Sequence, residues 1–474
     1  MRPSFLARCL VLLLLALVPL RIVAAGYLPT DDALRHAAKA VSGRPWSDVL
    51  VLRSEVTMDS HPGWHALLGA VHRLSGAGAP ALVVFSVVVL QLALLVPGLF
   101  LVRRPEAWAL ALAAFATFEP RILSRFASGR PFVLAAALLA ALCLLAARLP
   151  RDGLLRRGRL ALLALAFGLV AWIHPSWHLF LLPVAACLLA RRFRLAVSLG
   201  VALALGVLVA GILYGHPLEF VGQSLLHTWL AMGSPAPPGT LAIEFLPGDG
   251  SPLLVLCVLG LLLWRRQRGA WRADLLSDPV FALGLLGWLL GWLVVRFWSD
   301  WGAVAALAWI ATELDGVLGE RVANGSPARV PLAAAAGFVA LVACSAPLRG
   351  GPAAERPYLS LSSAAADPAL PQPGGILYTD DMRLFYQLFY SRPQAPFRYV
   401  VGYEPALMPP EDLAVFRGIL AERTPGSYAP WVAKMRPRDR LVLLSREGQP
   451  RIPGLEWTQV SQSVWSGRVP SAAR

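Results

Sequence analysis

Long apolar runs recur from the N-terminus to about position 346, and this pattern limits the possible folds more than any other feature. Hydrophobic residues make up 57% of the 474 positions, and charged residues only 15%. A water-soluble domain has neither this composition nor such runs. We therefore expect a polytopic α-helical membrane protein with about eleven transmembrane helices. The expected spans are residues 5–25, 80–102, 106–119, 131–148, 160–173, 176–190, 195–213, 252–265, 279–297, 302–318 and 330–346.

Basic clusters between the runs predict the topology, because cytoplasmic loops carry an excess of Arg and Lys. The formal net charge is +15, but most of it lies in these short clusters, which excludes nucleic acid as a partner. The clusters lie at residues 2–8, 103–104, 148–159, 191–194, 265–272 and 313–329. The opposite, outer set comprises residues 26–79, 119–130, 174–175, 214–251, 298–301 and everything after 347. We expect a multi-pass protein of the inner (plasma) membrane with its C-terminus outside.

The first apolar run allows two interpretations. Arg2 and Arg8 precede a leucine-rich core, and small residues end it, as in a cleaved signal peptide. The length of the run and Arg21 near its end favour an uncleaved first helix. In both cases Gly26 emerges on the outer side.

Three regions are expected along the chain. Residues 1–346 form the transmembrane domain, and its first outer loop, 26–79, contains an amphipathic helix at 62–74 that should lie in the membrane interface. Residues 347–372, rich in Pro, Ala and Ser, predict a linker. Residues 373–474 predict a small soluble α/β domain on the outer face. Its expected strands are 376–379, 398–402, 440–445 and 457–465, and its expected helices are 381–390 and 410–422.

Two adjacent acids, Asp31 and Asp32, follow the first span. Ionisable groups at the edge of a bilayer are costly unless solvated or paired, so these acids are functional candidates. The alternative is that they cap a helix that starts at Ala33. Asp59 and His61, at the entry of the interfacial helix, are expected to face a site.

A third acid, Glu119, lies among three arginines, Arg121, Arg125 and Arg130, in the second outer loop. One interpretation is that Glu119 neutralises Arg121 or Arg125 within the loop. However, an arginine cluster on the outer side opposes the positive-inside rule, which indicates a bound anion. The planar guanidinium suits a phosphate. Further candidates in outer turns are His174, His178 and Arg296. His61, His65 and His72 border the apolar face of the interfacial helix. Interfacial packing is favoured over metal binding for them, because positions 61 and 72 lie about 16 Å apart along the helix axis.

In this order, the residues resemble the GT-C superfamily of membrane glycosyltransferases, which includes protein O-mannosyltransferases, oligosaccharyltransferase catalytic subunits and the aminoarabinose transferase of lipid A. The resemblance implies transfer of a sugar from a polyprenyl-phosphate donor to a lipid, glycan or protein acceptor on the outer face. It implies Asp31 or Asp32 as the base and Glu119 as a second acid that orients the acceptor or supports the base. Candidates for the donor phosphate are Arg121, Arg125, Arg130, Arg296 and His174, and candidates that line the site are Asp59, His61 and His178.

The chain departs from the oligosaccharyltransferase branch, since it lacks a clear Asp-x-Asp in the second outer loop and a Trp-Trp-Asp after the last span. Metal dependence therefore stays open, with a divalent cation (Mg or Mn) on Asp31, Asp32 and Glu119 as an alternative. Two other classes remain: a transporter or flippase of a lipid-linked precursor, and a non-catalytic membrane scaffold. A transporter would place its ionisable residues at the midplane of broken helices, whereas these lie at outer helix ends.

Overall fold

The computed structural model describes residues 2–149, 156–232, 246–267, 275–323, 325–346 and 356–470. The chain forms two compact units. One, here called the helical unit, comprises Met1–Leu28, Val84–Pro217 and Glu244–Gly350. The other, here called the mixed unit, comprises Pro29–Val83, Leu218–Ile243 and Gly351–Arg474. The predicted first outer loop and the predicted C-terminal domain thus contribute to the same unit.

Every predicted apolar run coincides with helical structure. The elements are α1 (Pro3–Ala24), α5 (Ala79–Leu95), α6 (Pro97–Leu101), α7 (Pro105–Phe118), α9 (Phe132–Ala146), α10 (Arg157–Ile173), η1 (Trp177–Phe180), α11 (Leu181–Leu189), α12 (Phe193–Tyr214), α14 (Pro252–Gln267), α15 (Pro279–Gly291), α17 (Ala303–Arg321) and α18 (Arg329–Ser345). Within the described residues, four helical stretches are long and apolar enough to cross a membrane: Pro3–Ala24, Ala79–Leu101, Phe193–Tyr214 and Val295–Arg321. Other apolar helices are shorter. The helices indicate a multi-pass membrane protein, while the number of crossings stays a prediction.

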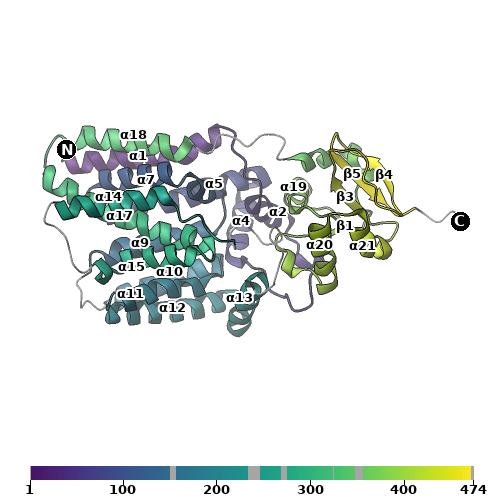
Figure 1. Cartoon of the computed structure of the whole chain (residues 1–474), viewed down its shortest axis with the longest axis horizontal. Coiled ribbons are helices and arrows are strands. Elements are labelled where there is room, and N and C mark those ends of the chain that lie inside the picture. The colour runs from purple at the N-terminus through teal and green to yellow at the C-terminus, as the bar shows by residue number, and fades with distance from the viewer. Residues whose placement is uncertain are drawn as a thin grey trace. The chain divides into compact units, whose positions relative to one another are not determined.

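In the helical unit, α1 lies beside α18, α7 beside α17 and α18, and α10 beside α12 (Figure 1). The α10–α12 pair packs closely at Gly206, where an added Cβ would lie 2.5 Å from Cβ of Phe167. Small residues at such crossings let two backbones approach each other. A buried ion pair joins α7 to α18: Arg329 donates from Nε and Nη2 to the two Glu106 oxygens, both at 2.9 Å.

The segment after α15 differs from its prediction. The span expected at 279–297 is interrupted, because helix α15 ends at Gly291. The residues expected to form an outer turn, 298–301, are helical. A short helix α16 (Val295–Phe297) leads into a π-helical turn, η4 (Trp298–Gly302), which continues into α17. Glycine explains the close packing here, since a Cβ at Gly287 would lie 2.5 Å from Cα of Gly302. Single π-helical turns inside longer helices frequently occur at functional sites.

The mixed unit combines short helices with one five-stranded sheet. Its first helices are α2 (Asp32–Ser42), α3 (Trp46–Val49), α4 (Pro62–Ser75) and α13 (Pro217–Met232). The C-terminal part contains β1 (Ile376–Tyr378), α19 (Met382–Ser391), β2 (Arg398–Tyr399), α20 (Pro410–Glu422), α21 (Ala429–Lys434), β3 (Arg440–Leu444), β4 (Glu456–Gln459) and β5 (Val464–Arg468). The strand order is β2-β1-β3-β5-β4, with β2, β1 and β3 parallel and β3, β5 and β4 antiparallel. The single strand expected at 457–465 is wrong, because this stretch turns after Gln459 and forms the β4–β5 hairpin.

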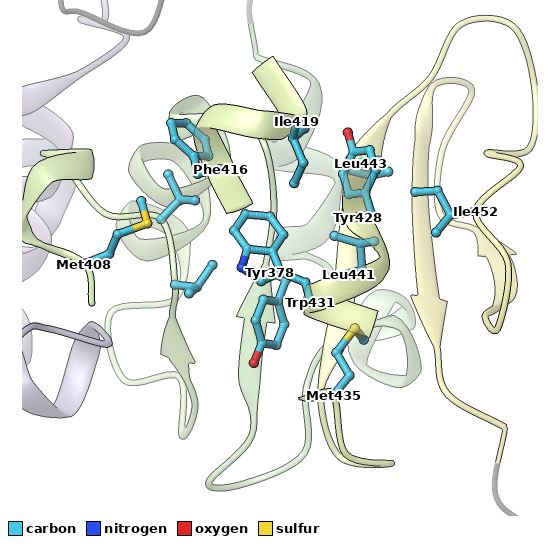
Figure 2. Close-up of a cluster of buried hydrophobic side chains, with 12 residues drawn as sticks. Tyr378, Met408, Phe416, Ile419, Tyr428, Trp431, Met435, Leu441, Leu443 and Ile452 are labelled. Carbon is cyan, nitrogen blue, oxygen red and sulfur yellow. The ribbon is translucent and has the colours of Figure 1, made fainter. Parts of the chain in front are cut away.

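The core of the C-terminal part lies between the sheet and helices α20 and α21. Figure 2 shows Trp431 and Tyr378 within this cluster, and their ring centroids are 5.6 Å apart. Trp431 is fully buried and donates its Nε1–H to Oδ1 of Asp412 at 2.8 Å. Leu441 of β3 and Phe416 of α20 complete the centre.

The expected linker 347–372 is described only from Arg356, and residues 347–355 lie outside the described residues. From Pro357 the chain forms two 3-10 helices, η7 (Pro357–Ser362) and η8 (Ala364–Ala369). Tyr358 is fully buried: its backbone N–H donates to Gln387 Oε1 at 3.0 Å, and its hydroxyl donates to Asp381 Oδ2 at 3.0 Å. These residues therefore pack against α19.

Candidate functional site

The two adjacent acids lie at the start of α2, which begins at Asp32 with Asp31 as its N-cap residue. The Asp31 side chain makes no capping hydrogen bond, so helix capping does not account for it. Arg35, one turn further, donates its Nε–H to Asp32 Oδ1 at 2.6 Å. Burial disfavours the Arg35 charge, but Asp32, Tyr386 and Tyr403 raise the pKa of Arg35, so Arg35 stays charged. Its guanidinium carbon lies 4.0 Å from the centroid of the Tyr403 ring.

Another acid of the mixed unit, Asp59, begins a chain of hydrogen-bonded histidines. Nδ1 of His65, on α4, lies 2.6 Å from Asp59 Oδ2. Nε2 of His65 lies 2.8 Å from Nδ1 of His36, on α2. His36 is fully buried and His65 is 9% exposed. His65 is thus packed inside the unit and also takes part in a hydrogen-bonded chain, which the sequence did not predict.

The charges in this chain follow from its surroundings. Burial opposes ionisation of Asp59, but His65, the backbone N–H of His61 and nearby Lys39 together hold the pKa of Asp59 well below its usual range. Burial lowers the pKa of His65, so His65 is neutral near pH 7 and donates its Nδ1–H to the Asp59 carboxylate. Burial likewise lowers the pKa of His227, on α13, to about 4.

The predicted candidates Asp59 and His61 do come together. His61 is the N-cap residue of α4, and its backbone N–H donates to Asp59 Oδ1 at 3.0 Å. Its ring centroid lies 4.8 Å from that of His36 and 6.2 Å from that of His65. His72 lies three turns along α4, where its Nδ1 is 2.8 Å from the Ala77 carbonyl oxygen.

In the helical unit, Glu119 joins α7 to the short helix α8 (Pro120–Phe126) and is 7% exposed. Burial and the nearby Asp249 charge raise the pKa of Glu119. A hydrogen bond from Ser251 and the charge of Arg121 lower it, but the net shift is upward. The Ser251 hydroxyl also accepts the Nε1–H of Trp298 at 2.5 Å. Glu119 is therefore tied to the π-helical turn through one serine.

Two of the predicted phosphate-binding arginines share one carboxylate. Arg125 donates from Nε to Asp300 Oδ1 at 2.9 Å and from Nη2 to Oδ2 at 3.2 Å. Nε of Arg296 lies 3.3 Å from Asp300 Oδ2. The Asp300 side chain is only 6% exposed, and those of Arg125 and Arg296 are 19% and 20% exposed. The two guanidiniums therefore converge on one largely buried carboxylate.

The remaining predicted residues lie in different surroundings. Arg121 is 89% exposed, and its only described ion pair is a 3.5 Å contact with the exposed Asp249. Arg121 and Arg125 thus have longer-range partners at 249 and 300, while the Arg121 charge also acts on Glu119. Arg130 lies half-buried just before α9.

His174 ends α10 and lies near Arg125 through a shared aromatic ring. Its ring centroid is 6.4 Å from that of Phe132, and the Arg125 guanidinium carbon is 4.6 Å from the same centroid. Nδ1 of His174 is 2.6 Å from the Ser176 hydroxyl. His178, on η1, buries an Nδ1 that has no hydrogen-bond partner in the described part of the chain. Across the described residues, no three His, Cys, Asp or Glu side chains are grouped so as to hold a metal ion.

Asp300, His36 and His65 belong to the candidate site but are not predicted as site residues from the sequence. For Asp300 a signal exists, because an acid four residues after Arg296 can pair with it along a helix. His36 follows Asp32 by one helical turn, and His65 follows His61 by the same spacing. That spacing places each pair on one helix face, but nothing in the sequence shows that the two faces meet.

Comparison with solved structures identifies the fold. The structure matches the crystal structure of ArnT from Cupriavidus metallidurans in the apo state with a TM-score of 0.52, at 16% identity, over 96% of this chain and 97% of that chain. The chain has the GT-C fold. A second match is the archaeal oligosaccharyltransferase AglB from Archaeoglobus fulgidus, solved with an inhibitory peptide and a dolichol-phosphate, with a TM-score of 0.48, at 12% identity, over 92% of this chain and 69% of that chain. No protein-family model and no curated protein sequence matches the chain. The predicted GT-C resemblance is confirmed for the fold.

Proposed function

We propose that this chain is a membrane glycosyltransferase that moves a sugar from a polyprenyl-phosphate donor to an acceptor at the outer face of the inner (plasma) membrane. The observation that carries the proposal is the Asp300 cluster, in which Arg125 and Arg296 converge on one buried carboxylate in a chain with the GT-C fold. Two guanidiniums held side by side suit a phosphate, because each can donate paired hydrogen bonds to its oxygens.

The arginines bind the donor phosphate. Asp300 holds the two guanidiniums side by side, and a guanidinium donates hydrogen bonds to phosphate oxygens in a fixed, planar geometry. When the sugar leaves, negative charge grows on the lipid phosphate, and cations already in place stabilise it without rearrangement. His174, which shares the Phe132 ring with Arg125, assists at the same phosphate. Arg130 is a secondary candidate for the donor phosphate. Arg121 is also secondary, because its side chain is largely solvent-exposed.

Asp31 acts as the base that removes the proton of the acceptor. Asp32 accepts a hydrogen bond from Nε of the buried Arg35 at 2.6 Å. We assign the catalytic role to Asp31, and we assign the Asp32–Arg35 pair to fixing the start of α2. A carboxylate serves as general base when it accepts the proton as the new bond forms.

Glu119 is the second acid and orients the acceptor. Its raised pKa increases the share of the protonated form, which can donate a hydrogen bond. Asp59, His61 and His178 remain candidates for lining the site.

The test is transfer of radiolabelled sugar from a panel of polyprenyl-phosphate sugars by membranes that contain the wild type or one variant. We expect transfer from at least one donor, a loss of about 100-fold or more in kcat with Asp31→Asn, and a raised KM for the donor with Arg125→Lys and Arg296→Lys. Arg423→Lys, a surface change in the C-terminal part, serves as the control. Movement of the intact lipid-linked sugar across the membrane without transfer would contradict the proposal and indicate a flippase.

The orientation is tested separately. Single cysteines placed at exposed positions of the C-terminal part should react with a membrane-impermeant thiol reagent in intact cells stripped of their outer barrier. Reaction only after the membrane is opened would contradict an outer location of residues 373–474.

A further inference from the structure

The chain Asp59–His65–His36 has a single consistent arrangement of hydrogens when Asp59 is ionised and both histidines are neutral. The Asp59 carboxylate can only accept, so His65 donates its Nδ1–H. The other nitrogen of His65, Nε2, then carries a lone pair and accepts the Nδ1–H of His36. His36 is left with Nε2 as its proton-accepting nitrogen. Asp59 thus sets the tautomer of a ring that it does not touch.

This arrangement stabilises a proton that arrives at His36. A protonated His36 donates its Nδ1–H to His65, and His65 in turn donates to the negatively charged Asp59, so the positive charge is balanced through two short hydrogen bonds. A carboxylate that orients an imidazole and stabilises its charged form is the principle of the Ser-His-Asp triad. Here a second imidazole extends it.

His36 lies close in sequence to the proposed base. It follows Asp32 by four residues on α2, so the two side chains share one helix face, which also carries Arg35. The titratable or charged groups around the relay are Arg35 and Lys39 on α2, His61 at the start of α4, His227 on α13, and Tyr386 and Tyr403 from the C-terminal part. The cations on α2 oppose the charge on His36, whereas Asp59 favours it.

We propose that His36 receives the proton which the reaction releases, and that His65 and Asp59 are positioning residues which hold His36 as a proton acceptor. The inference rests on the proposed function. As the acceptor oxygen bonds to the sugar carbon, the bond from that carbon to the phosphate oxygen breaks, and its electron pair leaves with the lipid phosphate. The acceptor proton passes to the carboxylate of Asp31, the proposed base, and then to Nε2 of His36. It leaves to solvent by way of Asp59, whose side chain is 22% exposed.

The first test is the pH profile of kcat/KM for sugar transfer. In the wild type, activity should fall on the acidic side as the relay becomes protonated and can no longer take a proton. We expect the midpoint of the acidic limb of this profile to move to lower pH, toward the pKa of a carboxylate, by about one pH unit or more in each of His36→Gln, His65→Gln and Asp59→Asn. Activity at pH 7 should fall about tenfold in each variant. His72→Gln, on the same helix but outside the relay, should leave the limb in place. An acidic limb that does not move in any of the three variants overturns the inference.

The second test does not need activity. In protein labelled with ¹⁵N-histidine, His65 of the wild type should show the Nδ1–H tautomer, and Asp59→Asn should lose this preference, with the signals assigned through His36→Gln and His65→Gln. If the tautomer is found but no donor supports transfer at any pH, the proposed function fails and the hydrogen-bond chain stands. If transfer occurs while His65 carries its proton on Nε2 in the wild type, the relay fails and the proposed function stands.

Discussion

Replacing Asp300 by Asn is the perturbation that the structure defines most closely. The change removes a negative charge from between Arg125 and Arg296, and Asn can replace only part of the hydrogen bonding. Removing one partner of a fully buried ion pair costs about 3–5 kcal/mol. Because each arginine side chain is about one-fifth exposed, solvent recovers part of this cost, and we expect a loss of about 2–3 kcal/mol in the free energy of unfolding.

Asp249→Asn is the matched control. It makes the same chemical change in an ion pair with Arg121, but these side chains are 66% and 89% exposed. Exposed pairs contribute about 0–1 kcal/mol, so the control should leave stability within that range. Purified protein in detergent is unfolded by heat and followed by tryptophan fluorescence. Asp300→Asn should lower the Tm clearly and raise the donor KM about tenfold, since two unbalanced guanidiniums no longer hold their positions. Equal effects of the two substitutions would refute the reasoning from burial.

Three further predictions concern stability. Glu106→Gln should lower the free energy of unfolding by about 3–5 kcal/mol, because it removes the carboxylate charge beside the buried guanidinium of Arg329; a Tm equal to that of the wild type would contradict this. Folded His65 binds a proton less readily than the unfolded chain, so its contribution is intact above the ordinary histidine pKa of about 6.5 and is lost as the pH falls from there through the folded pKa. The Tm should therefore drop below about pH 6.5 by less in His65→Gln than in the wild type, and parallel curves would count against this. Trp431→Ala should lower the free energy of unfolding of the C-terminal part by about 3–5 kcal/mol, because it empties the centre of that core and removes the indole donor to Asp412. Faster proteolysis of residues 373–474 would support this prediction, and unchanged resistance to protease would contradict it.

Helices of the apolar runs were predictable because their signal is local. A run of apolar residues is helical in a membrane whatever its partners are, since the backbone must satisfy its own hydrogen bonds there. The start and end of α4 were also close to their prediction, because Pro62 begins the helix and Gly76, with a φ of +70°, ends it. By contrast, the β4–β5 hairpin was merged into one strand, because both strands are short and no Gly or Pro marks the turn.

The partners in the candidate site were not predictable, because each pair joins distant segments. Asp300 is 175 positions from Arg125, and His65 is 29 positions from His36. The sequence did indicate that the arginines of the second outer loop needed a negative partner or ligand, and the structure supplies Asp300 as one such partner. The structure also shows that His65 belongs to a hydrogen-bonded chain with Asp59 and His36. Which carboxylate a charged side chain finds depends on helix packing, and helix packing leaves no simple pattern in one sequence.

The central claim is that Asp31 serves as the base in sugar transfer from a polyprenyl-phosphate donor. The most direct measurement is the single-turnover rate of transfer by purified wild type and Asp31→Asn in detergent or lipid, with release of the polyprenyl phosphate followed in the same samples. Asp48→Asn, an exposed acid of the same unit, controls for loss of charge alone. We predict that sugar transfer and phosphate release proceed together in the wild type and the control, and fall together at least 100-fold in Asp31→Asn. Full activity of Asp31→Asn, or no transfer by the wild type from any donor, would contradict the account.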